Sequence, residues 1–271
     1  MPTKFPIWLM LILFSCKTIK AQQWSGNSIF DERRFLFEVK QIDEFFERFN
    51  NDKRSFIKRN IGKYYPGIKI DRPSLLRTLF DKESKQIVPA NKKEFIKDVT
   101  DPNDPLFLKF YMPGWWAEAS CIFIYNNKPV SARVTLIIET DSSQASKWVI
   151  KRIECNGIKQ STGKLLFPLR QNPAKFLSPM SHATNFIALA RAFDDKGNLG
   201  SYITGDYLSD NSSASFMQAL LTSQLTFRYI NSIKYYFSQI PGWRFTVASC
   251  VRTDSVNSGW LVTDMVQIQG K

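Results

Sequence analysis

Two stretches of the chain have almost the same sequence. Pro113–Cys121 reads PGWWAEASC, and Pro241–Cys250 reads PGWRFTVASC. Proline cannot donate to a strand ladder and glycine accepts the positive φ of a sharp turn, so each Pro-Gly pair is typical of a corner before a strand. The repeat therefore predicts two related halves, each beginning a sheet at this point. We expect the tryptophan after each corner to fill the core beneath it.

The pattern around the first corner predicts helices followed by strands. Apolar residues recur at helical spacing from Phe35 to Phe49, and further helices are expected to begin at Asp71 and Asn91. After the corner, apolar and polar residues alternate with a period of two, which favours an antiparallel meander. The expected strands are residues 117–125, 130–139 and 146–154.

A second helix and strand series follows a segment rich in glycine and proline. Helices are expected from Ser178-Pro179 onward and over 213–221, and strands over 225–237, 244–251 and 259–268. The fold class is therefore α+β, with two related halves that each pack helices on a curled antiparallel sheet. The expected organisation is a signal peptide (1–21), a first α+β domain (24–156), a linker (157–178) and a second, shorter α+β domain (179–271).

The first residues have the composition of an export signal. Lys4 precedes an apolar run from Phe5 to Phe14, and Ala21 is a small residue suited to cleavage. The run is shorter than the roughly 20 residues of a bilayer span, so we expect no transmembrane span in the mature protein. Cleavage after Ala21 would release a periplasmic or secreted protein. Alternatively, Leu13–Cys16 resembles a bacterial lipobox, in which Cys16 would be lipidated.

The chain is strongly basic, with a formal net charge of +13. Loss of residues 1–21 would remove three lysines and no acid, which leaves +10. Such a protein is attracted to anionic glycans and lipid headgroups. The positive charges are spread along the chain, and the densest group, Lys53–Lys63, is typical of a solvated helix face. Charge therefore favours an anionic envelope component as a partner and indicates no specific nucleic-acid site.

Three cysteines would remain after removal of the leader: Cys121, Cys155 and Cys250. An odd number implies one disulfide with a free thiol, or no disulfide. Their spacing matches no metal motif, so small buried side chains are the simplest interpretation.

Four segments carry a resemblance to known proteins: Phe37–Asn50 (FEVKQIDEFFERFN), Lys147–Ile150, Ser181–Phe186 and Asn257–Leu261. They resemble a family of secreted, uncharacterised proteins from Bacteroidota, and the similarity covers nearly all of the mature chain. That family has no known activity, so the resemblance implies no functional residues. The order of helices and curled sheet in the first half is also similar to the NTF2-like fold, a cone-shaped α+β architecture.

The sequence contains no complete catalytic or metal-binding motif. His182 is the single histidine, which excludes histidine-rich metal sites and makes a Ser-His-Asp triad depend on that residue alone. Its position just inside a predicted helix start favours a capping or core role. Segments 157–164 and 194–198 approach the phosphate-loop and calcium-loop patterns, but each lacks required residues. We therefore expect no cofactor and no metal.

The sequence best fits a binding or protein-interaction module of the bacterial envelope, with an unidentified protein or an anionic component as its partner. Aromatic side chains suit pockets and interfaces. The candidate pocket residues are Trp115, Trp116, Trp148, Trp243 and Trp260, together with Glu118.

One rival hypothesis is electrostatic binding of anionic envelope glycans or lipids. Another is a small-molecule enzyme whose base is a strand carboxylate in an NTF2-like cone. Glu118, Glu139 and Glu154 are the candidates for that base. The simpler interpretations are core packing for the tryptophans and solvent exposure for the carboxylates.

Overall fold

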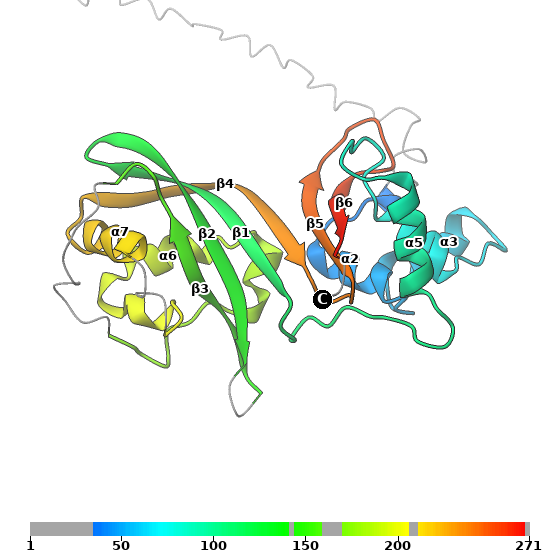
Figure 1. Ribbon diagram of the computed structural model, residues 1–271, viewed down its shortest axis with the longest axis horizontal. Coiled ribbons are helices and arrows are strands. Elements are labelled where there is room, and N and C mark those ends of the chain that lie inside the picture. The colour runs from blue at the N-terminus through cyan, green and yellow to red at the C-terminus, as the bar shows by residue number, and fades with distance from the viewer. Residues whose placement is uncertain (1–34, 141–143, 159–169, 206–210, 269–271) are drawn as a thin grey trace, which may run out of the picture.

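The computed structural model describes residues 35–140, 144–158, 170–205 and 211–268 (Figure 1). The predicted leader, with Cys16 and Ala21, lies outside these residues, as does much of the predicted 157–178 linker. The elements before the first strand are α2 (Ile42–Phe49), α3 (Phe56–Tyr64), α4 (Arg72–Thr78) and α5 (Pro89–Val99). The others, in chain order, are β1 (Trp115–Tyr125), β2 (Lys128–Thr140), β3 (Ser146–Glu154), η1 (Pro179–Thr184), α6 (Ala188–Asp194), η2 (Lys196–Ser201), α7 (Asn211–Leu221), β4 (Leu225–Phe237), β5 (Trp243–Cys250) and β6 (Gly259–Gln267).

The strands form one antiparallel sheet in the order β3-β2-β1-β4-β5-β6. The predicted α+β class, with helices packed on a curled antiparallel sheet, is confirmed. Strands from both predicted halves share this sheet because β1 pairs with β4 along its whole length, from Trp115 opposite Phe237 to Tyr125 opposite Leu225.

The molecule has two lobes that β4 connects (Figure 1). The sheet lobe contains β1–β3 with η1, α6, η2 and α7, and the helical lobe contains α2–α5 with β5 and β6. Strand β4 runs from the sheet lobe, where it lies beside β1, to the helical lobe, where its last residues pair with β5. None of the described helices has the length and apolar composition that a membrane crossing needs.

The first helices pack on the last strands. We expected the helices before β1 to cover β1–β3, but apart from Phe46, which meets Trp115 of β1, their aromatic residues pack mainly on β4 and β5. Phe49 stacks on Phe245 at 6.2 Å between ring centroids, and Phe95 meets Trp243 edge-on at 5.4 Å. The middle helices α6 and α7 cover the sheet lobe, where Phe193 and Phe216 both pack on Phe123. Helices of each half therefore pack on strands of both halves, and β5 is covered by helices from the first half.

One hydrophobic core continues through both lobes. Phe237, at the end of β4, stacks on Trp115 of β1 at 5.4 Å and on Phe245 of β5 at 4.9 Å. Stacked aromatic pairs add about 0.5–1.5 kcal/mol each beyond the burial of their area. The lobes are consequently joined by packed rings as well as by the backbone of β4.

The first predicted helix is interrupted in the structure. Residues 35–37 are helical, but Val39, on the expected apolar stripe, lies outside any helix, and α2 begins only at Ile42. The Val39 N–H donates to the carbonyl of Ser258 at 3.0 Å, and the Trp260 N–H donates to the Val39 carbonyl at 2.7 Å. These bonds to a distant segment hold Val39 in an extended conformation, which local periodicity does not reveal.

Two buried arginines donate to backbone carbonyls that no helix or strand satisfies. The Arg48 guanidinium donates to the carbonyls of Phe37 and Glu38 at 2.7 and 2.6 Å, and to that of Leu36 at 3.3 Å. Burial lowers the pKa of Arg48 to about 10. Arg72 makes a similar set of bonds, to the carbonyls of Phe49, Val99 and Leu106. Both arginines fix irregular segments of the helical lobe from inside.

Both Pro-Gly corners precede strands, as predicted. Gly114 and Gly242 lie in the left-handed region, with φ of 95° and 76°. Each glycine carbonyl accepts a hydrogen bond from the residue just after the partner strand, from Ser238 at 2.7 Å and from Ile268 at 2.7 Å. The two corners are therefore built in the same way.

Candidate functional site

A groove opens where strands β4 and β5 separate. The two strands pair only from Lys234 opposite Ala248 to Phe237 opposite Phe245. Beyond that point β4 stays with β1, whereas β5 stays with β6 in the helical lobe. The groove between them, here called the β4 groove, has a volume of about 620 Å³. It is lined by Thr184, Asn185, Ile187, Ala190, residues 227–233, Ser249 and Trp260.

The first part of β4 has one free edge in the groove. Residues Leu225–Ile233 pair with β1 on one side. On the other side, no strand or isolated bridge of the described residues pairs with them. Alternate residues of a strand direct their N–H and C=O groups to opposite edges, so this edge presents unpaired backbone donors and acceptors. Its exposed side chains are Thr226, Arg228, Tyr229, Asn231 and Ser232.

The opposite wall comes from the junction of η1 and α6. Asn185 and Phe186 both have left-handed backbones, with φ of 49° and 55°. Asparagine tolerates this conformation, but phenylalanine is strained in it. Phe186 is held there because its ring is buried against Trp148 at 5.0 Å. The strained turn presents Ile187 at the groove with 67% of its surface exposed, which is unusual for isoleucine.

The groove lining combines apolar side chains with neutral polar ones and one positive charge. Ile187 and Tyr229 are large exposed apolar residues at its sides, and the Trp260 ring packs on buried Tyr235 at 5.1 Å. Arg228 is the charged residue of the lining, which includes no carboxylate. An extended ligand could therefore bond to the free edge, cover apolar side chains and place an acidic group near Arg228.

Most of the five tryptophans predicted to line pockets are core residues, and two of them, Trp115 and Trp148, pack edge-on at 5.2 Å. Trp115, Trp148 and Trp243 are buried, and each indole N–H donates to a protein oxygen, of Phe110, Pro179 and Asp98 respectively. Trp116 lies on the opposite face of the sheet from Trp115 and stacks on Tyr236 at 5.3 Å. Trp260 is the member of the set that lines the β4 groove.

The three candidate carboxylates lie beside basic side chains. Glu118 is 3.3 Å from the Arg133 guanidinium and also accepts from the Tyr236 hydroxyl at 3.3 Å. Arg133 contacts Glu154 at 2.9 Å as well, and Glu139 lies 4.0 Å from Lys147. A general base with a raised pKa needs apolar walls, whereas these carboxylates face cations.

Both ring nitrogens of His182 form hydrogen bonds to acceptor atoms. Its Nδ1 is 2.7 Å from the carbonyl oxygen of Pro179, and its Nε2 is 2.9 Å from Asp43 Oδ1. Since both partners accept, a doubly protonated ring satisfies both bonds. The imidazole is fully buried while Asp43 is partly exposed, the reverse of a catalytic triad, in which the imidazole faces the substrate. His182 therefore fastens η1 to α2.

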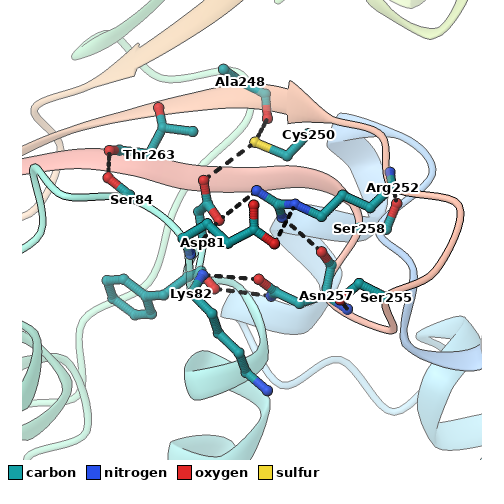
Figure 2. Close-up of polar contacts among 12 residues, drawn as sticks. Asp81, Lys82, Ser84, Ala248, Cys250, Arg252, Ser255, Asn257, Ser258 and Thr263 are labelled. Carbon is teal, nitrogen blue, oxygen red and sulfur yellow. Dashed lines mark hydrogen bonds and ion pairs between the residues drawn. The ribbon is translucent and has the colours of Figure 1, made fainter.

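A polar network fixes the β5–β6 loop to the segment after α4 (Figure 2). The Asp81 carboxylate accepts from the Arg252 guanidinium at 2.8 Å and from the Cys250 thiol at 3.7 Å (Figure 2). The Asn257 side chain donates to the Phe80 carbonyl at 3.0 Å and accepts from the Lys82 N–H at 2.9 Å. This network holds the loop that leads into Gly259 and Trp260.

The cysteine of this network is not activated as a nucleophile. Burial, with a smaller effect of the Asp81 charge, raises the pKa of Cys250 from 9.0 to about 11. Burial raises the pKa of Cys121 to about 12. Cys121, Cys155 and Cys250 are all free thiols. A catalytic cysteine needs a lowered pKa.

Alkylation of Cys250 in the folded protein should consequently be slow. A raised pKa means that the thiol keeps its proton, so near pH 8 the folded protein holds on the order of 100-fold less Cys250 thiolate than an ordinary thiol. Iodoacetamide labelling, read by mass spectrometry, should show faster reaction in the same protein unfolded by urea. Equal rates in the two states would contradict this environment for Cys250.

Sequence patterns missed most of the β4 groove. Ile187 belongs to a segment with an ordinary helix pattern, and Arg228 and Tyr229 belong to one with an ordinary strand pattern. The sequence feature that could have indicated the groove is the polar pair Asn231-Ser232 inside that strand. The register of β4 against β1 shifts beside this pair, between Ser120 and Cys121. Such a bulge is common at sheet edges.

Potential metal-ligating side chains do not cluster among the described residues. No group of three His, Cys, Asp or Glu side chains gathers there as a metal site requires. In comparisons with protein families, curated proteins and solved structures, none matched this chain. The candidate site therefore rests on its geometry, and that geometry is of a groove beside a free strand edge.

Proposed function

We propose that this protein is a binding module of the bacterial envelope that takes up an extended peptide segment of another protein in the β4 groove. The observation that carries the proposal is the free edge of β4 at Leu225–Ile233, next to exposed Ile187 and Tyr229. A peptide added to a sheet edge gains main-chain hydrogen bonds, and adjacent apolar surface gives selectivity. Because Arg228 faces no carboxylate within the groove lining, we expect an acidic residue in the ligand.

Strain in the groove wall supports binding in preference to an inert surface. A left-handed phenylalanine costs on the order of 1–3 kcal/mol, and such strain clusters at ligand sites. Phe186 and the exposed Ile187 beside it belong to the same turn. The partnered carboxylates Glu118 and Glu154 favour this function over carboxylate catalysis.

The broader proposal keeps the expected export and duplication. The protein would act in the periplasm or outside the cell, either free or anchored through Cys16. The matching geometry at Gly114 and Gly242 supports descent of the two corners from one repeated unit.

Selection of random displayed peptides on the intact protein tests the function. Selected peptides should be extended and acidic, and they should bind at least about tenfold more weakly to Ile187→Glu, because the new carboxylate repels acidic ligands and removes an apolar contact. Hydrogen exchange with a selected peptide bound should slow at the backbone amides of 225–233.

The matched control is Ile68→Glu, which makes the same change at an exposed isoleucine of the α3–α4 connection. Its peptide affinity should equal that of the natural protein. If peptides bind Ile187→Glu and the natural protein equally, or protect amides elsewhere, the β4 groove is not the binding site.

A further inference from the structure

A second, smaller pocket lies in the helical lobe and borders the Asp81 network at Lys82 and Asn257. It has a volume of about 240 Å³ and is lined by Phe37, Arg77, Thr78, Lys82, Val256 and Asn257. Phe37 and Val256 provide apolar surface, whereas Arg77 and Lys82 provide two positive charges. In Figure 2 the Lys82 side chain points away from Asp81 and Arg252. We call this site the cationic pocket.

A third cation adds to the positive potential there. Lys92 of α5 is half-buried, with its ammonium 4.7 Å above the Phe80 ring. Its pKa is lowered by burial and by the like charges of Lys82 and Arg77. The three cations are therefore close enough to repel one another, and an anion between them would relieve that repulsion.

The carboxylates near the cationic pocket form hydrogen bonds or ion pairs with other residues. Asp81 and Glu83 both contact the Arg252 guanidinium, at 2.8 and 3.0 Å. Asp71 caps α4 by accepting from the Ser74 N–H. On α5, Glu94 accepts from Gln267 and Asp98 accepts from the Trp243 indole. No carboxylate lines the pocket itself.

We infer that the cationic pocket binds a phosphate monoester carried on a small apolar group. The ester's dianionic oxygens would lie between Arg77 and Lys82, which line the pocket, since arginine and lysine both bind phosphate through charge-assisted hydrogen bonds. Lys92 lies outside the lining and would add to the positive potential. The apolar part would cover Phe37 and Val256. This site is separate from the β4 groove, and its inference does not depend on peptide binding.

Calorimetric titration of the intact protein with three probes tests the assignment. Phenyl phosphate should bind saturably and more tightly than inorganic phosphate, while phenol should not bind. The variants Arg77→Gln and Lys82→Gln should each weaken phenyl phosphate at least about tenfold, as loss of a charge-assisted contact predicts. A spectroscopic titration of the Lys92 ammonium should show that bound phenyl phosphate makes it harder to deprotonate.

The matched control is Lys93→Gln, which removes the same charge from the exposed neighbour of Lys92 on α5. It should leave phenyl phosphate affinity within about twofold of the natural value. Equal weakening by Lys93→Gln and Lys82→Gln would show a general effect of net charge and overturn the site. Absence of saturable phenyl phosphate binding, or equal binding of phenol, would also overturn it.

A vesicle experiment distinguishes a lipid from a free source of the phosphate. Vesicles of phosphatidylcholine with phosphatidic acid should compete with phenyl phosphate if a lipid headgroup enters the pocket. The alternative result is that the vesicles bind the natural protein and Lys82→Gln equally, while phenyl phosphate still binds the natural protein more tightly than Lys82→Gln. In that case the ligand is a soluble phosphate ester.

Discussion

Replacing Gly259 by alanine should lower the free energy of unfolding by about 4 kcal/mol or more. Gly259 has a φ of +96°, and a Cβ there would lie 2.1 Å from the Val39 carbonyl oxygen and 2.8 Å from its nitrogen. Both atoms belong to backbone that is bonded to Ser258 and Trp260, so no side-chain movement can relieve the clash. The bridge between the first helices and β6 would have to open.

Substitutions at two other glycines distinguish the cost of the steric clash from the cost of backbone strain. Gly242→Ala combines a φ of +76° with open space around the new Cβ, so it should cost only about 1–2 kcal/mol. Gly62→Ala in α3 meets nothing within 4 Å and should stabilise the protein by about 0.5–1 kcal/mol. Urea denaturation gives the free energy of unfolding of each of the three variants. A loss for Gly259→Ala no larger than for Gly242→Ala would contradict the close approach to Val39.

The second large effect is expected from Arg48→Met, which should cost about 3–4 kcal/mol. Methionine keeps much of the side-chain volume but leaves the buried carbonyls of Leu36, Phe37 and Glu38 without their donor. An ion pair can be replaced by apolar residues when both partners change. Here the partners are backbone carbonyls, which cannot be replaced.

Arg48→Lys should give an intermediate loss, because one compact ammonium cannot reach three carbonyls in the way that a planar guanidinium does. Arg54→Met removes an arginine whose side chain is 88% exposed and should change stability by less than about 0.5 kcal/mol. Denaturant melts of the three variants provide the comparison. Similar stabilities for Arg48→Met and Arg54→Met would rule out the structural role of the Arg48 guanidinium.

Local patterns were enough to predict the strands. The third strand was expected over 146–154 and is observed as Ser146–Glu154, and the fourth was expected over 225–237 and is observed as Leu225–Phe237. Alternation and turn residues determine such elements within a few positions. Asp71 was likewise expected at a helix start, and its side chain caps α4.

Long-range pairing could not be predicted in the same way. The helix expected over Phe35–Phe49 is interrupted between residues 37 and 42 because Val39 pairs with Gly259, a residue near the other end of the sequence. The helix expected from Ser178 is divided by left-handed Asn185 and Phe186 into the 3-10 helix η1 and the helix α6. In both places tertiary contacts override the local propensity.

The candidate site depends on how two strands diverge, which no single segment encodes. Trp115 and Trp116 are adjacent in sequence, yet one is buried and the other lies on the opposite face of the sheet. The sequence could identify these aromatic residues but not the side that each would face. The β4 groove arises because β1 and the helical lobe draw β4 and β5 apart beyond Lys234.

The packing of the first helices on the last strands has a kinetic consequence. As the chain is made or threaded from its N-terminus, Phe49 and Phe95 of α2 and α5 stay uncovered until β5 is available, because Trp243 and Phe245 of that strand bury them. Contacts between residues so far apart in the sequence slow folding, because the entropy of closing a long loop is lost before these contacts can stabilise the fold. We therefore expect the helical lobe to acquire its native packing last, although its helices are the first part of the fold in the sequence.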